Sequence, residues 1–230
     1  MHDRTTTPTT SRTTSRTSRT SPTATPVPTP VRPAERGATR DEGRVRTVGR
    51  WMVSFTGFPL GGLTAHLVVG PVDGPAAAIV GGLITGVILG AIQWWGLGPA
   101  RPRPAPWIGA TGLGLLAGLT VGAAAVDHGT GIGALAVMGA ISGLAVGVAQ
   151  AVVLRARLGV RVLAWPPVVA GAWALGWTIT TAVGVDVDAR WTVFGSGGAI
   201  TVTALTAVLP LVLNRRGPTS GPTTTARSSS

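Results

Sequence analysis

Few residues of this sequence could perform chemistry, and most of them lie inside long apolar runs. Gln93, Gln150 and Thr206 each stand near the end of such a run. A polar side chain inside hydrocarbon is costly, so each is a candidate functional residue. Two interpretations stay open. The three side chains form a polar collar at the inner mouth of a central path, or each bonds across a helix interface for about 1 kcal/mol.

A second candidate group combines a histidine with acidic residues. His66 is the only ionisable residue well inside an apolar run, roughly 21 Å along it at 1.5 Å per residue. Four acids lie between the runs: Asp73, Asp127, Asp186 and Asp188. Together these groups could form an outer entry site for a proton or a cation. The competing interpretation is a hydrogen-bonded lone histidine and solvated loop acids.

A serine in the segment Gly195, Ser196, Gly197, Gly198 resembles the Gly-x-Ser-Gly step of intramembrane serine proteases. Those enzymes place their catalytic histidine in a later helix, and no histidine follows position 128. The absence of Cys and Lys removes thiol chemistry, cysteine-bound zinc and lysine nucleophiles. No nucleotide-binding loop or metal-binding helix motif is present. We therefore predict no catalytic residue, no metal site, no cofactor and no enzymatic activity.

Six long apolar runs position these residues. The sequence is 45% hydrophobic and only 12% charged, which is typical of a membrane protein. A helix needs about 20 residues to cross a hydrocarbon core about 30 Å thick, and each run is long enough. The sequence predicts an all-α protein with six transmembrane helices, at about 52–70, 76–97, 107–126, 131–154, 165–185 and 191–213.

The short connections between successive runs are alternately rich in arginine and rich in acids. Because arginine-rich connections stay in the cytoplasm, the pattern predicts cytoplasmic N- and C-termini in a bacterial cell membrane. Arg190 is the only exception on the opposite side. The arginines on the predicted inner side are Arg50, Arg101, Arg103, Arg155, Arg157, Arg161, Arg215 and Arg216.

The runs repeat as three tandem hairpins, at about 51–106, 107–163 and 164–213. The second and fourth runs carry the same glycine row followed by glutamine, at an offset of 150 − 93 = 57. Two-span units all point the same way, so these are parallel repeats. The rows are Gly82, Gly86 and Gly90 before Gln93, and Gly139, Gly143 and Gly147 before Gln150, with Gly114, Gly118 and Gly122 in the third run.

Residues four apart share one helix face, so each glycine row predicts a smooth stripe that another backbone can approach closely. Such stripes are an ordinary means of helix packing in membranes. Alternatively, the stripes face a pore or mediate oligomerisation.

The ends of the even runs resemble those of uncharacterised bacterial multi-pass proteins built of tandem glycine-rich hairpins. The matching residues are Gly90, Gln93 and Trp94 in one copy, and Gly147, Gln150, Leu154 and Arg155 in the next. The resemblance implies the hairpin fold and carries no assigned activity.

Both ends of the chain are poor in large apolar side chains. Residues 1–50 are rich in Thr, Ser, Pro and Arg, and residues 214–230 are similar, so both are predicted to be disordered. The arginines could contact anionic lipid headgroups, in addition to their effect on topology, and no specific nucleic-acid partner is expected. An alternative is that translation starts at Val48 or Met52.

Two functional classes follow from these observations. The first is a non-enzymatic packed membrane module, serving as an accessory or scaffold to other membrane proteins. The glycine stripes and the scarcity of charge within the spans favour it. The alternative is a small permease or channel for a small solute, a proton or a cation, which the parallel repeats and the Gln, His and Asp positions favour.

Overall fold

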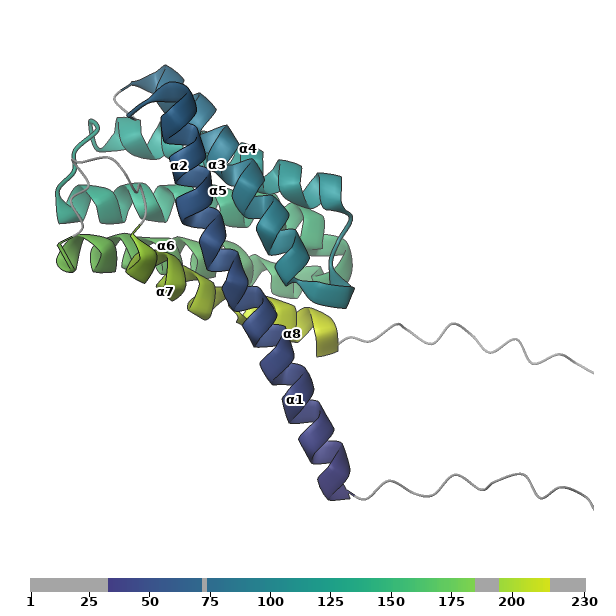
Figure 1. Cartoon of the computed structure of the whole chain (residues 1–230). Coiled ribbons are helices and arrows are strands. Elements are labelled where there is room, and N and C mark those ends of the chain that lie inside the picture. Colours follow the sequence, from purple (N-terminus) through teal and green to yellow (C-terminus); the bar gives the residue numbers. More distant parts are fainter. Residues whose placement is uncertain (1–32, 72–73, 185–194, 216–230) are drawn as a thin grey trace, which may run out of the picture.

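The computed structural model describes residues 33–71, 74–184 and 195–215, which form helices joined by short connections (Figure 1). The α-helices are α1 (Pro33–Met52), α2 (Gly57–Val69), α3 (Pro75–Gly96), α4 (Pro104–Ala125), α5 (Ile132–Leu158), α6 (Trp165–Ala182), α7 (Ser196–Thr206) and α8 (Val208–Arg215). Short 3-10 helices lie between some of them: η1 (Val53–Thr56), η2 (Gly98–Ala100) and η3 (Gly159–Ala164). The predicted all-α class is confirmed.

Within these residues, five continuous helical segments are long and apolar enough to cross a membrane: Glu42–Val69, Pro75–Gly96, Pro104–Ala125, Ile132–Ala182 and Ser196–Arg215. The fourth has 51 residues and would extend about 75 Å as one straight helix, far beyond a hydrocarbon core. It is instead folded back at η3, so that α5 and α6 pack against each other. By the length and hydropathy of its helices, the chain is a multi-pass membrane protein.

Each long helix packs on the next one in the sequence, from α2 through α7, and α7 returns to contact η1 and α1. This order closes the bundle. Pro75 and Pro104 stand in the first turns of α3 and α4, where a missing N–H costs no helical hydrogen bond. Gly70 and Gly159 end α2 and α5 with φ of 75° and 58°, a conformation that glycine adopts without strain.

The bundle has two chemically different ends. At the arginine end, Arg50 donates from Nε to the carbonyl oxygen of Trp95 at 2.8 Å, and Arg157 donates to that of Ala100. Helices α1 and α8 both reach this end (Figure 1). At the opposite, histidine end, His66 and the connection between α4 and α5 line a common pocket.

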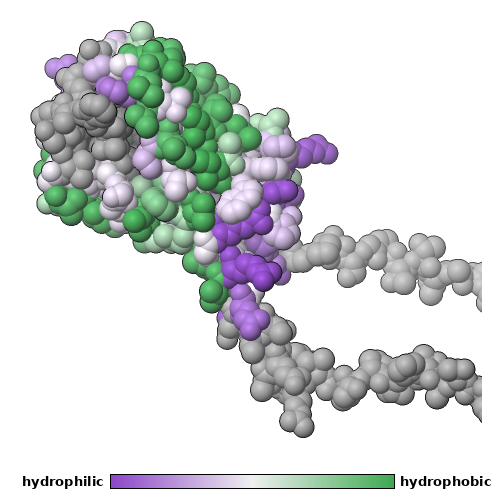
Figure 2. Space-filling model, viewed as in Figure 1, coloured by the Kyte–Doolittle hydropathy of each residue, from purple (hydrophilic) through white to green (hydrophobic). Residues whose placement is uncertain are grey.

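The outer surface of the bundle is apolar. Leu67 is 76% exposed, Val152 is 72% exposed and Leu113 is 62% exposed. A contiguous apolar surface of this kind fits hydrocarbon as its solvent. Figure 2 shows hydrophobic residues over much of the bundle, with hydrophilic residues gathered where α1 leaves it.

Most of the two predicted disordered tails, at residues 1–32 and 216–230, lies outside the described residues, whereas residues 33–50 of the first predicted tail belong to helix α1. Pro33 suits the first position of a helix, and Ala34, Glu35 and Arg36 all favour helical structure. The prediction weighed only the lack of large apolar side chains. It ignored the helical propensity of the charged residues that lead directly into the first apolar run.

The first and last segments are interrupted, each next to a proline. Pro59 has no N–H to offer the carbonyl of Phe55, and the preceding turn is the 3-10 helix η1. Pro210 likewise offers no N–H to the carbonyl of Thr206, where α7 ends. The sequence interpretation treated both runs as single uninterrupted helices.

Candidate functional site

Gln150 lies at the centre of a buried hydrogen-bonded cluster near the arginine end. Its Nε2 donates to Oε1 of Gln93 at 3.1 Å and to Oγ1 of Thr111 at 3.0 Å, and its Oε1 accepts from Nε1 of Trp165 at 2.9 Å. Thr111 donates in turn to the carbonyl oxygen of Trp107 at 3.0 Å. One side chain that is 2% exposed thus connects α3, α4, α5 and α6.

This geometry uses the full donor capacity of the Gln150 amide. Both N–H bonds and the carbonyl oxygen have protein partners, so the group is satisfied without water. The desolvation cost of a buried polar group is offset when the group is hydrogen-bonded and remains in full when it is left unpaired. Gln93 and Gln150, which were predicted from their common spacing, therefore meet as hydrogen-bond partners.

Thr206 belongs to a different cluster. Its Oγ1 accepts from Nε1 of Trp51 at 3.3 Å and donates to the carbonyl oxygen of Val202 at 2.7 Å. The same indole N–H also lies 2.9 Å from the carbonyl oxygen of Thr203. Trp51 is 1% exposed. These bonds connect α1 to α7 and do not reach the glutamine pair.

The predicted packing glycines face neighbouring backbones. A Cβ added to Gly86 would stand 2.7 Å from the carbonyl oxygen of Thr111, and one added to Gly118 would stand 2.6 Å from Cα of Ser142. Nothing but hydrogen fits at such a distance. By the same measure, Gly82, Gly86 and Gly90 face α4, Gly114, Gly118 and Gly122 face α5, and Gly139, Gly143 and Gly147 face α6.

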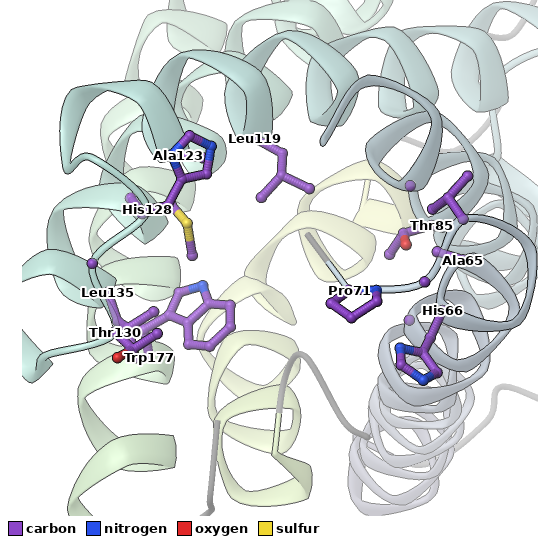
Figure 3. Close-up of a pocket in the computed structure, with 16 residues that line it drawn as sticks. Ala65, His66, Pro71, Thr85, Leu119, Ala123, His128, Thr130, Leu135 and Trp177 are labelled. Atoms are coloured by element: carbon purple, nitrogen blue, oxygen red, sulfur yellow. The ribbon is translucent and has the colours of Figure 1, made fainter. Parts of the chain in front are cut away.

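A pocket of about 240 Å³ opens at the histidine end. His66 and His128 stand on opposite sides of it, with Trp177 on the same side as His128 (Figure 3). The pocket reaches inward to Thr85 and is otherwise mostly apolar. For comparison, a cavity of roughly 150 Å³ holds a benzene molecule. The pocket therefore has room for a small apolar group, and the rim of the pocket carries polar atoms.

The acids predicted beside His66 are only partly placed. Asp127 is exposed in the connection between α4 and α5, directly before His128. Both residues have positive φ, 50° and 56°, in a tight turn closed by the bond from His128 N to Ala123 O at 2.9 Å. This backbone conformation is uncommon for residues other than glycine. Asp73, Asp186 and Asp188 lie outside the described residues.

Ser196 is the serine of the segment that resembles the step of intramembrane serine proteases. This serine is exposed at the start of α7. Within the described part of the chain, no group of three His, Cys, Asp or Glu side chains lies close enough to hold a metal ion.

The sequence interpretation missed the hydrogen-bonding tryptophans. Trp51 and Trp165 were not among the candidate residues, yet both indoles are buried and donate across helix contacts. In the described residues, the buried donors Trp107 Nε1, Ser142 Oγ and Thr180 Oγ1 have no hydrogen-bond partner.

No protein-family model, curated protein sequence or solved structure matches this chain. The resemblance to glycine-rich hairpin proteins therefore remains a hypothesis. The class defined by the helices themselves is that of an integral, multi-pass membrane protein.

Proposed function

We propose that the chain is a packed, six-span membrane module without catalytic activity, which supports a partner membrane protein as an accessory or scaffold subunit. The six spans are the first segment, α3, α4, α5, α6 and the last segment. They pair as three parallel hairpins, α1–α2 with α3, α4 with α5, and α6 with α7–α8.

The orientation places the arginine end in the cytoplasm, because arginines dominate every connection there. A cysteine at Val160 tests both the span count and the orientation. Val160 is 81% exposed in η3, between α5 and α6. An impermeant thiol reagent should label this variant only from the cytoplasmic side. If neither side gives labelling, residues 132–182 do not cross twice.

Hydrogen bonds that recur between hairpins support the proposed repeat. Trp165, which opens the third hairpin, donates to Gln150 of the second. Trp51, which opens the first, donates to Thr206 of the third. Thr206 stands where the repeat places the counterpart of the two glutamines, so two of the three tryptophans that open a hairpin bind the polar position of another hairpin. The third, Trp107, has no partner for its Nε1 among the described residues.

The observation that carries the proposal of a packed module is the saturated cluster around Gln150. A water-filled path needs polar groups that are free to exchange partners with a permeating species. Here the glutamine amide is 2% exposed and bonded on both its donor and acceptor sides. The glycine rows add backbone contacts that leave no room for a side chain.

The purified full chain in sealed liposomes provides the test of function. We expect proton and potassium permeability equal to that of empty liposomes, with an ionophore as the positive control. In native membranes, the chain should migrate in a complex larger than its own 23.2 kDa after mild solubilisation. Flux above the empty-liposome level, or migration only as the isolated chain, would contradict the proposal.

A permease is the second candidate, because the pocket at the histidine end and the two interrupted segments favour it. Pairs of proline-interrupted segments often mark the substrate site of transporters. Helix α7 contacts η1, so the interruptions lie near each other. Flux that is abolished by filling the pocket, for example with Ala65→Trp, would favour this alternative.

A further inference from the structure

A second, strongly basic groove lies at the arginine end, remote from the histidine pocket. It measures about 800 Å³ and is formed by α1, the connection between α3 and α4, and α8. Its walls carry four arginines from two helices that are far apart in the sequence, Arg44, Arg46, Arg50 and Arg215. The described lining contains no acidic residue. The groove therefore concentrates positive charge.

The floor of the groove is held in place by side chains from both flanking helices. Arg50 donates from Nε to the carbonyl oxygen of Trp95, and its guanidinium lies 4.4 Å from the centre of the Trp95 ring. Asn214 donates to the carbonyl oxygens of Pro210 at 2.8 Å and of Leu97 at 3.4 Å. The connection is thus tied to α1 and to α8, and Arg50 is held in position before any ligand arrives.

The position of the groove identifies the depth at which its ligand would lie. Trp95 is 44% exposed beside it, and an indole is favoured at the boundary between hydrocarbon and headgroups. The hydrophilic band of Figure 2 borders directly on the apolar surface of the bundle. A molecule bound here would place its polar part among the arginines and still reach the hydrocarbon.

We propose that this groove binds the headgroup of an anionic phospholipid through its phosphate. A guanidinium presents a planar fork of N–H donors that matches phosphate oxygens, and basic pockets between membrane helices suit such headgroups. The arginine-rich sequence before the first span predicted only a diffuse attraction to anionic lipid. The groove is more specific, since it requires Arg215 of α8. This inference holds for a packed module and for a permease alike.

The test compares two double variants with the same change in charge. Arg46→Gln with Arg215→Gln removes two groove arginines, whereas Arg155→Gln with Arg161→Gln removes two at the same end but outside the groove. All four side chains are exposed, so neither variant removes a buried contact. Binding of phosphatidylglycerol to the full chain in detergent is measured by native mass spectrometry, with phosphatidylcholine as the uncharged comparison.

At roughly 1 kcal/mol for each arginine near an anionic headgroup, the groove variant should bind phosphatidylglycerol about 30-fold more weakly. The affinity of the control variant for phosphatidylglycerol should stay within about threefold of that of the natural chain. Equal weakening of phosphatidylglycerol binding in both variants, or equal binding of phosphatidylglycerol and phosphatidylcholine to the natural chain, would overturn the proposal. A third arm adds inorganic phosphate. If millimolar phosphate displaces phosphatidylglycerol completely, the groove is a site for soluble phosphate and the lipid assignment is wrong.

Discussion

Replacement of Gly118 by alanine tests whether the glycine rows hold the helices together. The added Cβ would lie 2.6 Å from Cα of Ser142, whereas ordinary carbon contacts begin at 3.4 Å. Helices α4 and α5 must therefore separate locally by about 3.4 − 2.6 = 0.8 Å. A gap of this size forfeits a quarter to a half of the dispersion energy of the atoms that lose contact.

We expect this variant to lose about 1 to 3 kcal/mol of unfolding free energy, the usual cost of overpacking a core. The assay is reversible unfolding in mixed detergent and dodecyl sulfate micelles, followed by tryptophan fluorescence. Gly109→Ala in the same helix is the matched control, because its Cβ would meet nothing within 4 Å. Gly122→Ala, at 3.0 Å, should fall between the two. Equal stability of the Gly118 and Gly109 variants would refute the packing argument.

Two further substitutions test the buried clusters. Gln150→Leu should cost about 1 to 3 kcal/mol in the same assay, because it breaks three buried hydrogen bonds and leaves the Trp165 indole N–H without a partner, whereas Gln93→Leu should cost less, since it breaks only one of these bonds. A larger loss for Gln93→Leu would contradict this assignment. Trp51→Phe removes the indole donor to Thr203 and should cost about 0.5 to 1.5 kcal/mol, and an unchanged midpoint would show that the bond contributes nothing.

The helical framework could be predicted from the sequence because span length is fixed by the bilayer. Runs of about 20 apolar residues have only one stable form in hydrocarbon, so α3, α4, α5 and α6 start and end within a few residues of the predicted bounds. The breaks in the first and last helical segments could not be predicted from the sequence in the same way. Proline is tolerated in membrane helices when neighbours satisfy the freed carbonyl, and that depends on packing.

The common spacing of Gln93 and Gln150 from their glycine rows was visible in the sequence, but their hydrogen bond was not. Contact depends on the rotation of each helix about its axis, which a sequence without charged faces does not specify. The partners Thr111 and Trp165 come from two further helices and share no spacing with the pair. The basic groove was likewise hidden, because Arg46 and Arg215 lie at opposite ends of the described sequence.

In the proposed packed module, the bundle is open to a pocket at the histidine end and sealed beyond it. The chain contains no Cys, so a single introduced thiol reports one position. Thr85→Cys lies in the pocket, and Val146→Cys lies in the core, where Val146 is 1% exposed. A small impermeant thiol reagent, applied from each side of the membrane, should label Thr85→Cys from the histidine end only and Val146→Cys from neither side. Labelling of Val146→Cys at a similar rate would mean that water crosses the core, and the packed module would be wrong.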